Sequence, residues 1–314
     1  MPHMDQLLSV VIPAYNEEEN IENTARTVLA IADREKIPCQ LVFVSDGSKD
    51  RTFEKIQEAA AKDSRVRGVE FSRNFGKEAA ILAGLATGTG DCFVVMDCDL
   101  QHPPETIVEM YRLWQEGYEI VEGVKNSRGN ESAIYRGLTG IFYGIMTRMT
   151  KVEMRNTSDF KLIDRQVAEV LLKMPERKTF FRALTFWTGF KSTKVFYDVA
   201  ERAAGTTKWS TRSLLRYAFS NIISFSSAPL NMVTFIGIGA LLFSFIMGIQ
   251  TFIRWLCDDA IEGLTTVILI MLLLGGCILI GLGLIGQYLA AIYDEVKQRP
   301  RYIIRRDTEK SEKK

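Results

Sequence analysis

Apolar and polar positions follow two alternating patterns along the first 125 residues of the chain. Nearly continuous apolar runs of strand length end in polar residues at 8–16, 39–48, 66–72, 92–99 and 118–125. Between them, apolar residues recur at helical spacing in 20–35, 50–63 and 75–88. Apolar strands joined by helices are typical of an α/β domain with a mostly parallel sheet covered on both faces. In such sheets, ligands bind beyond the carboxyl ends of the strands.

The last third of the chain has a different pattern, with two long uncharged runs at 230–253 and 264–293. A helix rises about 1.5 Å per residue, so either run can cross a hydrocarbon core about 30 Å thick. A buried helical hairpin of a soluble protein is the alternative. We expect membrane helices at 229–254 and 263–293, between a domain at 1–210 and a basic cytoplasmic tail at 294–314.

Charges flank the two apolar runs asymmetrically. The segment before the first run contains four basic residues and no acid: Arg202, Lys208, Arg212 and Arg216. From Lys297 onward eight basic residues stand against three acidic ones, whereas the connection at 254–263 has a net charge of −2. Because positively charged loops stay in the cytoplasm, we expect both termini and the N-terminal domain inside and the connection outside.

Two segments are candidates for helices that lie in the membrane interface. Residues 211–228 place apolar side chains at helical spacing with arginines between them, which fits cations facing lipid headgroups. Residues 136–151 carry a similar apolar stripe. For this second segment, a helix packed on its own domain is an equal alternative.

Composition narrows the classes of function. A net charge of +1 over 314 residues predicts no nucleic-acid partner. The mean hydropathy of +0.02 is high for a chain with 25% charged residues, as expected when a membrane part follows a soluble part. With only two histidines, His3 and His102, a histidine-built zinc site is excluded. Five scattered cysteines without a C-x-x-C pair favour reduced thiols over a disulfide framework.

The first candidate for chemistry is the stretch VVMDCDLQHPPE, residues 94–105. Asp97 and Asp99 stand two positions apart at the end of an apolar run, so both carboxylates leave the strand on the same side. Two like charges that close repel each other unless a cation lies between them, and a divalent cation with oxygen ligands meets that need. An acidic surface loop is the alternative. Polar residues that end the neighbouring strands favour the metal site.

The phosphate-binding loops of common nucleotide folds are absent from the sequence. No G-x-x-x-x-G-K-[ST] occurs, and Gly88 and Gly90 form a G-x-G that lacks its third glycine. A metal and basic side chains would therefore have to balance the negative charge of a nucleotide. A dinucleotide-dependent dehydrogenase is disfavoured.

Six stretches resemble, in order, the family 2 glycosyltransferases of the polyprenyl-phosphate branch: VVIPAYNEEENI, VSDGSKDRT, FSRNFGKEAAILAGL, MDCDLQHPPE, NTSDFKLIDR and ERAAGTTKW. The resemblance covers nearly the whole chain. It is strongest to bacterial bactoprenol (undecaprenyl-phosphate) glucosyltransferases, and dolichol-phosphate mannose synthases share the soluble core. It implies a Rossmann-like cytosolic domain of the GT-A fold, followed by interfacial helices and two transmembrane helices.

The resemblance implies a nucleotide-sugar site at the first strands. Pro13, Tyr15 and Glu17 would hold the base and the ribose, and Asp46 would hydrogen-bond the base. For Asp46 an ordinary turn is the alternative, since Asp-Gly is a common turn pair. Its place at the end of a strand favours binding.

The resemblance also assigns a metal site and a closing loop. Asp97, Asp99 and Gln101 match the D-x-D-x-Q motif that ligates Mg²⁺ or Mn²⁺ on the donor diphosphate, which makes both aspartates part of the catalytic site. Arg202 and Lys208 bracket a loop that would close over the diphosphate. A basic linker before the membrane is the alternative for this loop.

Cations that receive a lipid phosphate are expected after the run at 118–125. The candidates are Lys125, Arg128 and Arg136. The family often has arginine where Lys125 stands, and lysine cannot form the bidentate hydrogen bonds of an arginine. For Arg128, a solvated surface loop is an equal alternative.

Asp159 matches the residue proposed as the base in relatives. Because a phosphate monoester has a second pKa of about 6, it needs little deprotonation, so orienting the acceptor or a cation is the alternative role.

The resemblance as a whole implies an inverting, metal-dependent enzyme at the cytoplasmic face of the inner (plasma) membrane. It would move one sugar, with UDP-glucose the expected donor, to undecaprenyl phosphate for cell-envelope glycans, and it would form a homo-oligomer such as a tetramer. N-acetylglucosamine, galactose or GDP-mannose donors stay open. A transport or polymer-export component is the alternative class, but two spans without an internal charge offer no translocation path.

Overall fold

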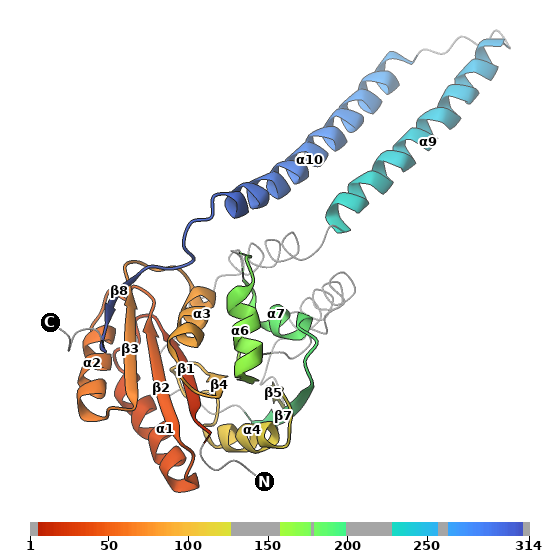
Figure 1. Ribbon diagram of the computed structural model, residues 1–314. Helices are drawn as coiled ribbons and strands as arrows, with labels where there is room; N and C mark the ends of the chain where they lie inside the picture. The colour runs from red at the N-terminus through yellow and green to blue at the C-terminus, as the bar shows by residue number, and fades with distance from the viewer. Residues whose placement is uncertain (1–5, 127–157, 177–178, 199–227, 257–262, 310–314) are drawn as a thin grey trace. The chain divides into compact units, whose positions relative to one another are not determined.

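The computed structural model describes residues 6–126, 158–176, 179–198, 228–256 and 263–309. The chain divides into two compact units, Met1–Lys208 together with Arg299–Lys314, and Trp209–Gln298. The first unit contains the sheet and the second contains two long apolar helices (Figure 1).

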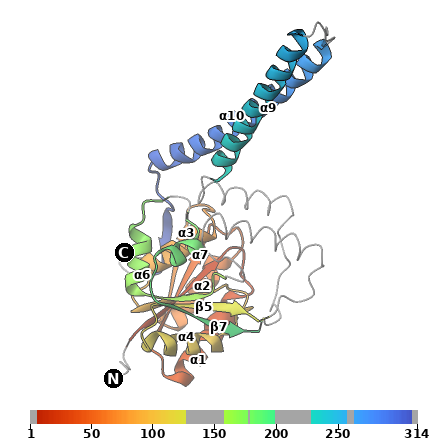
Figure 2. The same cartoon turned by 90° about the vertical axis from the view of Figure 1, so that its right-hand side faces the viewer.

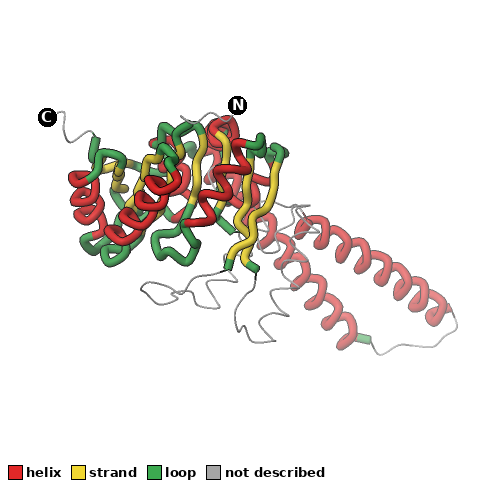
Figure 3. Tube along the Cα trace, turned by 90° about the horizontal axis from the view of Figure 1, so that it is seen from below, coloured by secondary structure: helices red, strands yellow, loops and turns green. Residues whose placement is uncertain are grey.

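One sheet with the strand order β7-β5-β6-β4-β1-β2-β3-β8 runs through the first unit (Figure 3). Five strands confirm the apolar runs of the sequence: β1 Leu8–Ala14, β2 Cys39–Ser45, β3 Val66–Phe71, β4 Cys92–Val95 and β5 Ile120–Lys125. Three further strands were not predicted: β6 Lys161–Asp164, β7 Ser192–Tyr197 and β8 Ile304–Asp307. The pairs β1–β2, β2–β3, β1–β4 and β5–β7 are parallel, so the expected mostly parallel α/β sheet is confirmed.

The first predicted helix illustrates how the apolar spacing becomes structure. Helix α1, Ile21–Glu35, buries residues on one face, among them Ile21, Val28 and Leu29. It ends where Lys36 takes a left-handed conformation with φ of 56°, and the Lys36 N–H bonds back to the last turn, a common way to satisfy the final carbonyls. The buried face packs on Val10 and Phe43 of the sheet, and each such large side chain contributes about 1.5–3 kcal/mol when fully buried.

Helices cover both faces of the sheet. Alternate strand residues point to opposite faces, so Val10 and Phe43 pack on one side with α1 while Val42 and Val69 pack on the other with α3, Lys77–Thr87. Figure 2 shows α3, α6 and α7 on one side of the sheet and α1 and α4 on the other. The bounds of the remaining helices are α2 Thr52–Lys62, α4 Glu105–Gln115, α6 Arg165–Lys173 and α7 Phe181–Trp187.

The antiparallel strand β6 brings a distant segment to the functional edge. Its first residue, Lys161, pairs with Val95, the last residue of β4. Residues that precede β6 therefore lie at the same edge as residues that follow β4. This pairing could not be read from the local pattern, because β6 has only four residues.

The C-terminal segment, expected as a basic tail at 294–314, contains the strand β8. Strand β8 pairs antiparallel with β3, and Arg306 bonds Glu70 through two contacts of 2.6 and 2.8 Å. The Glu70 side chain is 9% exposed, and the Arg306 guanidinium lies 4.4 Å from the ring centre of Phe53. Tyr302 stacks on Phe71 at 5.1 Å. The segment therefore completes the edge of the sheet and covers β3.

The second unit contains α9, Ala228–Leu256, and α10, Leu264–Val296, close to the runs predicted from the sequence. Both are long and apolar enough to cross a membrane, over Val233–Gln250 and Ile270–Val296. Nearly all of their described large apolar side chains are exposed. The helices contact each other where Val233 lies against Gly281, and a Cβ atom at position 281 would come within 3.2 Å of Val233 Cγ1.

Replacement of Arg306 tests whether β8 is an integral part of the sheet. We expect Arg306→Met to lower the free energy of unfolding by about 1–2 kcal/mol, because nearly buried Glu70 loses both hydrogen bonds. Arg305→Met is the matched control, since Arg305 is an exposed neighbour on the same strand. Thermal unfolding of the detergent-purified protein measures both variants, and equal melting temperatures for the two would contradict the assignment.

Candidate active site

Hydrogen bonds connect the two turns that follow the carboxyl ends of β1 and β2. The Asn16 N–H donates to Ser48 Oγ at 3.1 Å, and the Lys49 N–H donates to Asn16 Oδ1 at 2.8 Å. Asn16 has a φ of 55°, a conformation that asparagine tolerates better than most residues. These bonds fix the part of the sheet edge where Pro13, Tyr15 and Glu17 were predicted to hold a nucleotide.

The predicted nucleotide residues lie at this edge with different exposure. Pro13 is the second-to-last residue of β1, and Tyr15 follows the strand with 39% of its surface exposed. Glu17 accepts a hydrogen bond from Asn20 Nδ2 at 2.6 Å. The Tyr15 ring is therefore the most accessible of the three for stacking on a ligand.

Asp46 is almost completely buried and organises the next loop. Its two carboxylate oxygens accept hydrogen bonds from the N–H groups of Phe75 and Gly76, at 2.6 and 2.9 Å. Burial raises the pKa of Asp46, and these two bonds oppose the shift. Gly47 has a φ of 63° and lies against the Arg73 backbone, where a Cβ atom would collide. The loop before α3 is thus locked onto the end of β2, which fixes the backbone at the start of α3.

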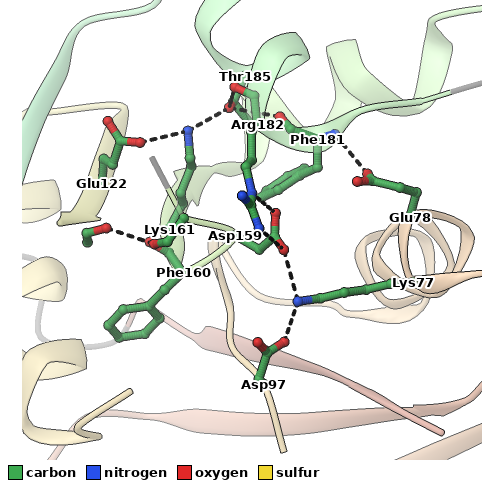
Figure 4. Close-up of polar contacts among 12 residues, drawn as sticks. Lys77, Glu78, Asp97, Glu122, Asp159, Phe160, Lys161, Phe181, Arg182 and Thr185 are labelled. Carbon is green, nitrogen blue, oxygen red and sulfur yellow. Dashed lines mark hydrogen bonds and ion pairs between the residues drawn. The ribbon is translucent and has the colours of Figure 1, made fainter. Parts of the chain in front are cut away.

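Asp97 and Asp159 meet at the sheet edge through one lysine. Asp97 follows β4 and Asp159 precedes β6, and Lys77, the first residue of α3, lies between them (Figure 4). Lys77 Nζ is 2.5 Å from Asp97 Oδ1 and 2.9 Å from Asp159 Oδ2. Burial opposes the charge on Lys77, but the two carboxylates outweigh it and raise the Lys77 pKa. The ammonium therefore neutralises two acids from distant parts of the chain.

Asp159 has a second cation that reaches it from α7. Arg182 Nε and Nη2 donate to the two Asp159 oxygens at 2.6 and 2.9 Å. Burial would raise the pKa of Asp159, whose side chain is 7% exposed, but Lys77 and Arg182 outweigh burial and hold the pKa well below its usual value. Asp159 is therefore firmly ionised and a weak base in this arrangement.

Asp97 and Asp99 both follow β4, which ends at Val95, and Asp99 lies in the turn after it. Cys98 between them is buried, with its Sγ 3.9 Å from Thr24 Oγ1, whereas both aspartates are partly exposed. The Gln101 N–H donates to Asp99 Oδ1 at 3.1 Å and shapes the following turn. His102 is buried and stacks on Phe160 at 4.7 Å, and burial lowers its pKa.

The aspartate pair fits a hard divalent cation. Burial would raise the pKa of Asp97, but Lys77 outweighs it and lowers the pKa, so Asp97 is ionised as a metal ligand must be. Within the described ranges, no group of three or more His, Cys, Asp or Glu side chains could hold a metal by itself. Mg²⁺ commonly takes one or two carboxylates and completes its shell with substrate phosphates and water. Asp97 and Asp99 meet that requirement.

Polar contacts hold α7 next to Asp159 (Figure 4). The Phe181 N–H at the start of α7 donates to Glu78 Oε2 at 2.8 Å. Farther along α7, Thr185 Oγ1 accepts from Lys161 Nζ at 3.1 Å, and Lys161 forms an ion pair with Glu122 at 3.2 Å. These contacts set the direction in which the neighbouring Arg182 leaves the helix.

The structure groups the predicted residues unevenly. Asp97 and Asp159 lie together, and Lys125 ends β5. The predicted residues Arg128, Arg136, Arg202 and Lys208, the interfacial helix at 211–228 and the stripe at 136–151 lie outside the described residues.

The prediction missed Lys77, Glu78, Lys161 and Arg182. Lys77 and Glu78 stand in the quoted stretch FSRNFGKEAAILAGL, where a lysine directly after a glycine at a helix start was the available signal. Arg182 has no comparable local signal, since it meets Asp159 only through the tertiary fold.

Replacement of Glu78 should change how stability depends on pH. Burial and nearby Asp159 raise the pKa of Glu78 from 4.5 to about 7. Between these values the folded protein keeps a proton that the unfolded chain has lost, so stability falls as pH rises. The melting temperature of Glu78→Gln relative to the wild type should therefore increase from about pH 5 to about pH 8. Glu109→Gln, on the exposed face of α4, serves as the control; a constant difference for Glu78→Gln would contradict the burial of this carboxyl.

Comparison with known proteins identifies relatives along the whole chain. Residues 9–172 match the family model described as glycosyl transferase family 2. An uncharacterized glycosyltransferase of Bacillus subtilis, YkcC, is 40% identical over 95% of this chain and 93% of its own length. A prophage bactoprenol glucosyl transferase homolog of Escherichia coli is 36% identical over 95% of this chain and 98% of its own. The bactoprenol glucosyl transferase of Shigella phage SfV is 36% identical, with 96% and 99% covered.

A solved structure has the same fold. Glucosyl-3-phosphoglycerate synthase from Mycobacterium tuberculosis, crystallised with Mn²⁺, UDP and glucosyl-3-phosphoglycerate, gives a TM-score of 0.53 at 18% identity and covers 71% of this chain and 80% of its own. At this identity the likeness shows the fold alone. The family match and the relatives show that this chain belongs to glycosyl transferase family 2 and is a glycosyltransferase of the GT-A fold.

Proposed function

We propose that this enzyme transfers one glucose from UDP-glucose to the phosphate of a polyprenyl phosphate, with inversion at the sugar and with a divalent metal. The observation that carries the proposal is the charge cluster at the sheet edge, where Lys77 lies between the ionised acids Asp97 and Asp159 and Arg182 contacts Asp159. A reaction between a diphosphate donor and a phosphate acceptor brings several negative charges together. Closely placed cations and carboxylates suit that task.

The metal assignment rests on Asp97 and Asp99, with Gln101 as the expected third ligand. When bound, Mg²⁺ or Mn²⁺ supplies positive charge to the leaving diphosphate. The carboxylates of Asp97 and Asp99, which follow β4, would hold that ion. Solved GT-A structures crystallised with Mn²⁺ or Mg²⁺ and UDP support the use of a metal in this fold.

The acceptor phosphate needs no strong base. Its second pKa is about 6, so near neutral pH it is largely a dianion. One phosphate oxygen attacks the anomeric carbon, the bond from that carbon to the donor diphosphate breaks, and UDP leaves with the electron pair. No proton has to be removed from the dianion. We assign Asp159 the role of holding Lys77 and Arg182 near the phosphates, which agrees with its lowered pKa.

The remaining predicted contacts complete the proposal. Donor binding is assigned to Pro13, Tyr15, Glu17 and Asp46 at the edge formed by β1 and β2, and to Arg202 and Lys208. Acceptor binding is assigned to Lys125, Arg128 and Arg136. The names of the relatives, bactoprenol glucosyl transferases, support the lipid acceptor and the glucose. We also propose a homo-oligomer, in keeping with the small residues along α9 and α10.

The proposed lipid acceptor and the two long apolar helices support a membrane setting. We propose that both helices span the inner (plasma) membrane, with the catalytic domain and both termini in the cytoplasm. The charge pattern supports this orientation, since basic segments flank the helices and the connection between them is acidic. Nucleotide-sugars are cytosolic, so the site has to face the same side.

A donor screen with the full-length protein tests the reaction itself. Purified protein is incubated with undecaprenyl phosphate, Mg²⁺ and, in turn, radiolabelled UDP-glucose, UDP-N-acetylglucosamine, UDP-galactose and GDP-mannose. We expect labelled lipid with UDP-glucose. Label from another donor alone would replace the sugar assignment, and no labelled lipid with any donor would refute transfer to this acceptor.

Replacement of Asp99 tests the metal assignment. We expect Asp99→Ala to lower transfer by a factor of about 100 or more while the protein stays folded, because a partly exposed metal ligand is lost and no core packing changes. Asp33→Ala, which removes an exposed acid on α1 that pairs with Arg65, should keep wild-type transfer. Near-normal activity of Asp99→Ala in the presence of a chelator would show that the aspartate pair holds no required metal.

Thiol labelling on intact cells tests the topology. A membrane-impermeant reagent should label Cys257 in the connection between the helices and spare Cys39, Cys92 and Cys98, which are buried in the cytoplasmic domain. A cysteine introduced by Asp259→Cys should react more strongly, because it lies nearer the centre of the acidic connection. Labelling of the connection only after cells are permeabilised would place it in the cytoplasm and invert the proposed orientation.

A further inference from the structure

Asp97 and Asp159 share one cation but differ in what else compensates them. In the described part of the chain, Lys77 is the only lysine or arginine within ion-pair distance of Asp97. Asp159 contacts Lys77 and also receives two hydrogen bonds from Arg182. If Lys77 moved away, Asp159 would keep a cation and Asp97 would lose its own.

We propose that Lys77 is an exchangeable counter-ion that holds the place of the metal at Asp97 until the donor arrives. The inference rests on the proposed metal-dependent function. The Lys77 ammonium lies 2.5 Å from Asp97 Oδ1. The Asp97 carboxylate is also one of the two that would ligate the metal. An ammonium and a divalent cation in contact with the same oxygen repel each other. Metal binding through Asp97 Oδ1 therefore requires Lys77 to turn away.

The local structure permits this movement. The Lys77 side chain is 40% exposed, and its stem is flexible. The backbone at the start of α3 is held by the two hydrogen bonds from Phe75 and Gly76 to Asp46. The side chain can thus change direction without displacing the helix. Arg182 has less freedom to move than Lys77. Contacts with Glu78 and Lys161 fix its helix, α7, and its guanidinium donates hydrogen bonds to both carboxylate oxygens of Asp159.

The exchange couples metal binding to donor binding. Without a nucleotide, a metal ion has to displace an ammonium that two carboxylates stabilise, so its affinity is low. A donor diphosphate offers anionic oxygens to the displaced ammonium and further ligands to the metal. The enzyme would therefore bind the metal together with the donor, and weakly without it.

Mn²⁺ titration of the full-length, detergent-purified protein tests this exchange without using activity. Free Mn²⁺ is followed by electron paramagnetic resonance, with and without UDP. We expect Lys77→Met to bind Mn²⁺ about tenfold or more tightly than the wild type when UDP is absent, because Asp97 is left uncompensated beside the negative Asp159. The strengthening caused by UDP should be smaller in the variant than in the wild type.

Three variants complete the design. Lys62→Met removes an exposed lysine that pairs with Glu22 and should leave Mn²⁺ affinity unchanged. Asp97→Asn added to Lys77→Met should abolish the gain, which places the bound ion at Asp97. Lys77→Gln is a second neutral variant that can still hydrogen-bond both carboxylates, and it should show the same gain if Lys77→Met unfolds.

The outcomes separate this inference from the proposed function. Unchanged or weaker Mn²⁺ binding by a folded neutral variant of Lys77, while UDP still promotes Mn²⁺ binding to the wild type, would overturn the exchange and leave the metal-dependent function standing. Absence of Mn²⁺ binding to the wild type even with UDP would overturn both. A gain that survives Asp97→Asn would place the ion elsewhere and also refute the exchange.

Discussion

The carboxylates of Asp97 and Asp159 repel each other unless a cation lies between them, and much of the surrounding structure satisfies that requirement. The Lys77 ammonium contacts both acids, so the start of α3 has to lie at the carboxyl end of β4. Asp46 holds this start through Phe75 and Gly76. The antiparallel pairing of β6 with β4 brings Asp159 to the same place. The order and pairing of the strands therefore bring together the same side chains whose charges compensate one another.

Buried charge around the site is costly unless each group has a partner. Here each has one: Lys161 pairs with Glu122 and bonds Thr185, and Glu78 accepts the Phe181 N–H. These contacts hold α7 and so direct the neighbouring Arg182 toward Asp159. Perturbed, closely paired ionisable groups are a frequent mark of functional sites.

The chain leaves the sheet domain after Lys208 and returns at Arg299, so the unit with the apolar helices is joined to the catalytic domain at both of its ends. The return matters because β8 covers the edge of β3, and exposed strand edges are prone to unwanted pairing. Arg306 and Tyr302 attach this strand through Glu70 and Phe71. Arg306, one of the basic residues after α10, is therefore part of the fold.

The sequence by itself determined the alternation of strands and helices up to β5, the two apolar helices and the aspartate pair after β4. These features are local, because apolar periodicity and strand-end carboxylates are visible within a few neighbouring residues. Only the tertiary structure decided that Lys77 and Arg182 meet Asp159, and that Ile304–Asp307 is a strand. Those pairings join residues far apart in the chain, through short strands whose burial depends on their neighbours. Charge compensation and the pairing of strand edges determine these contacts, and neither produces a periodic pattern of apolar residues in the sequence.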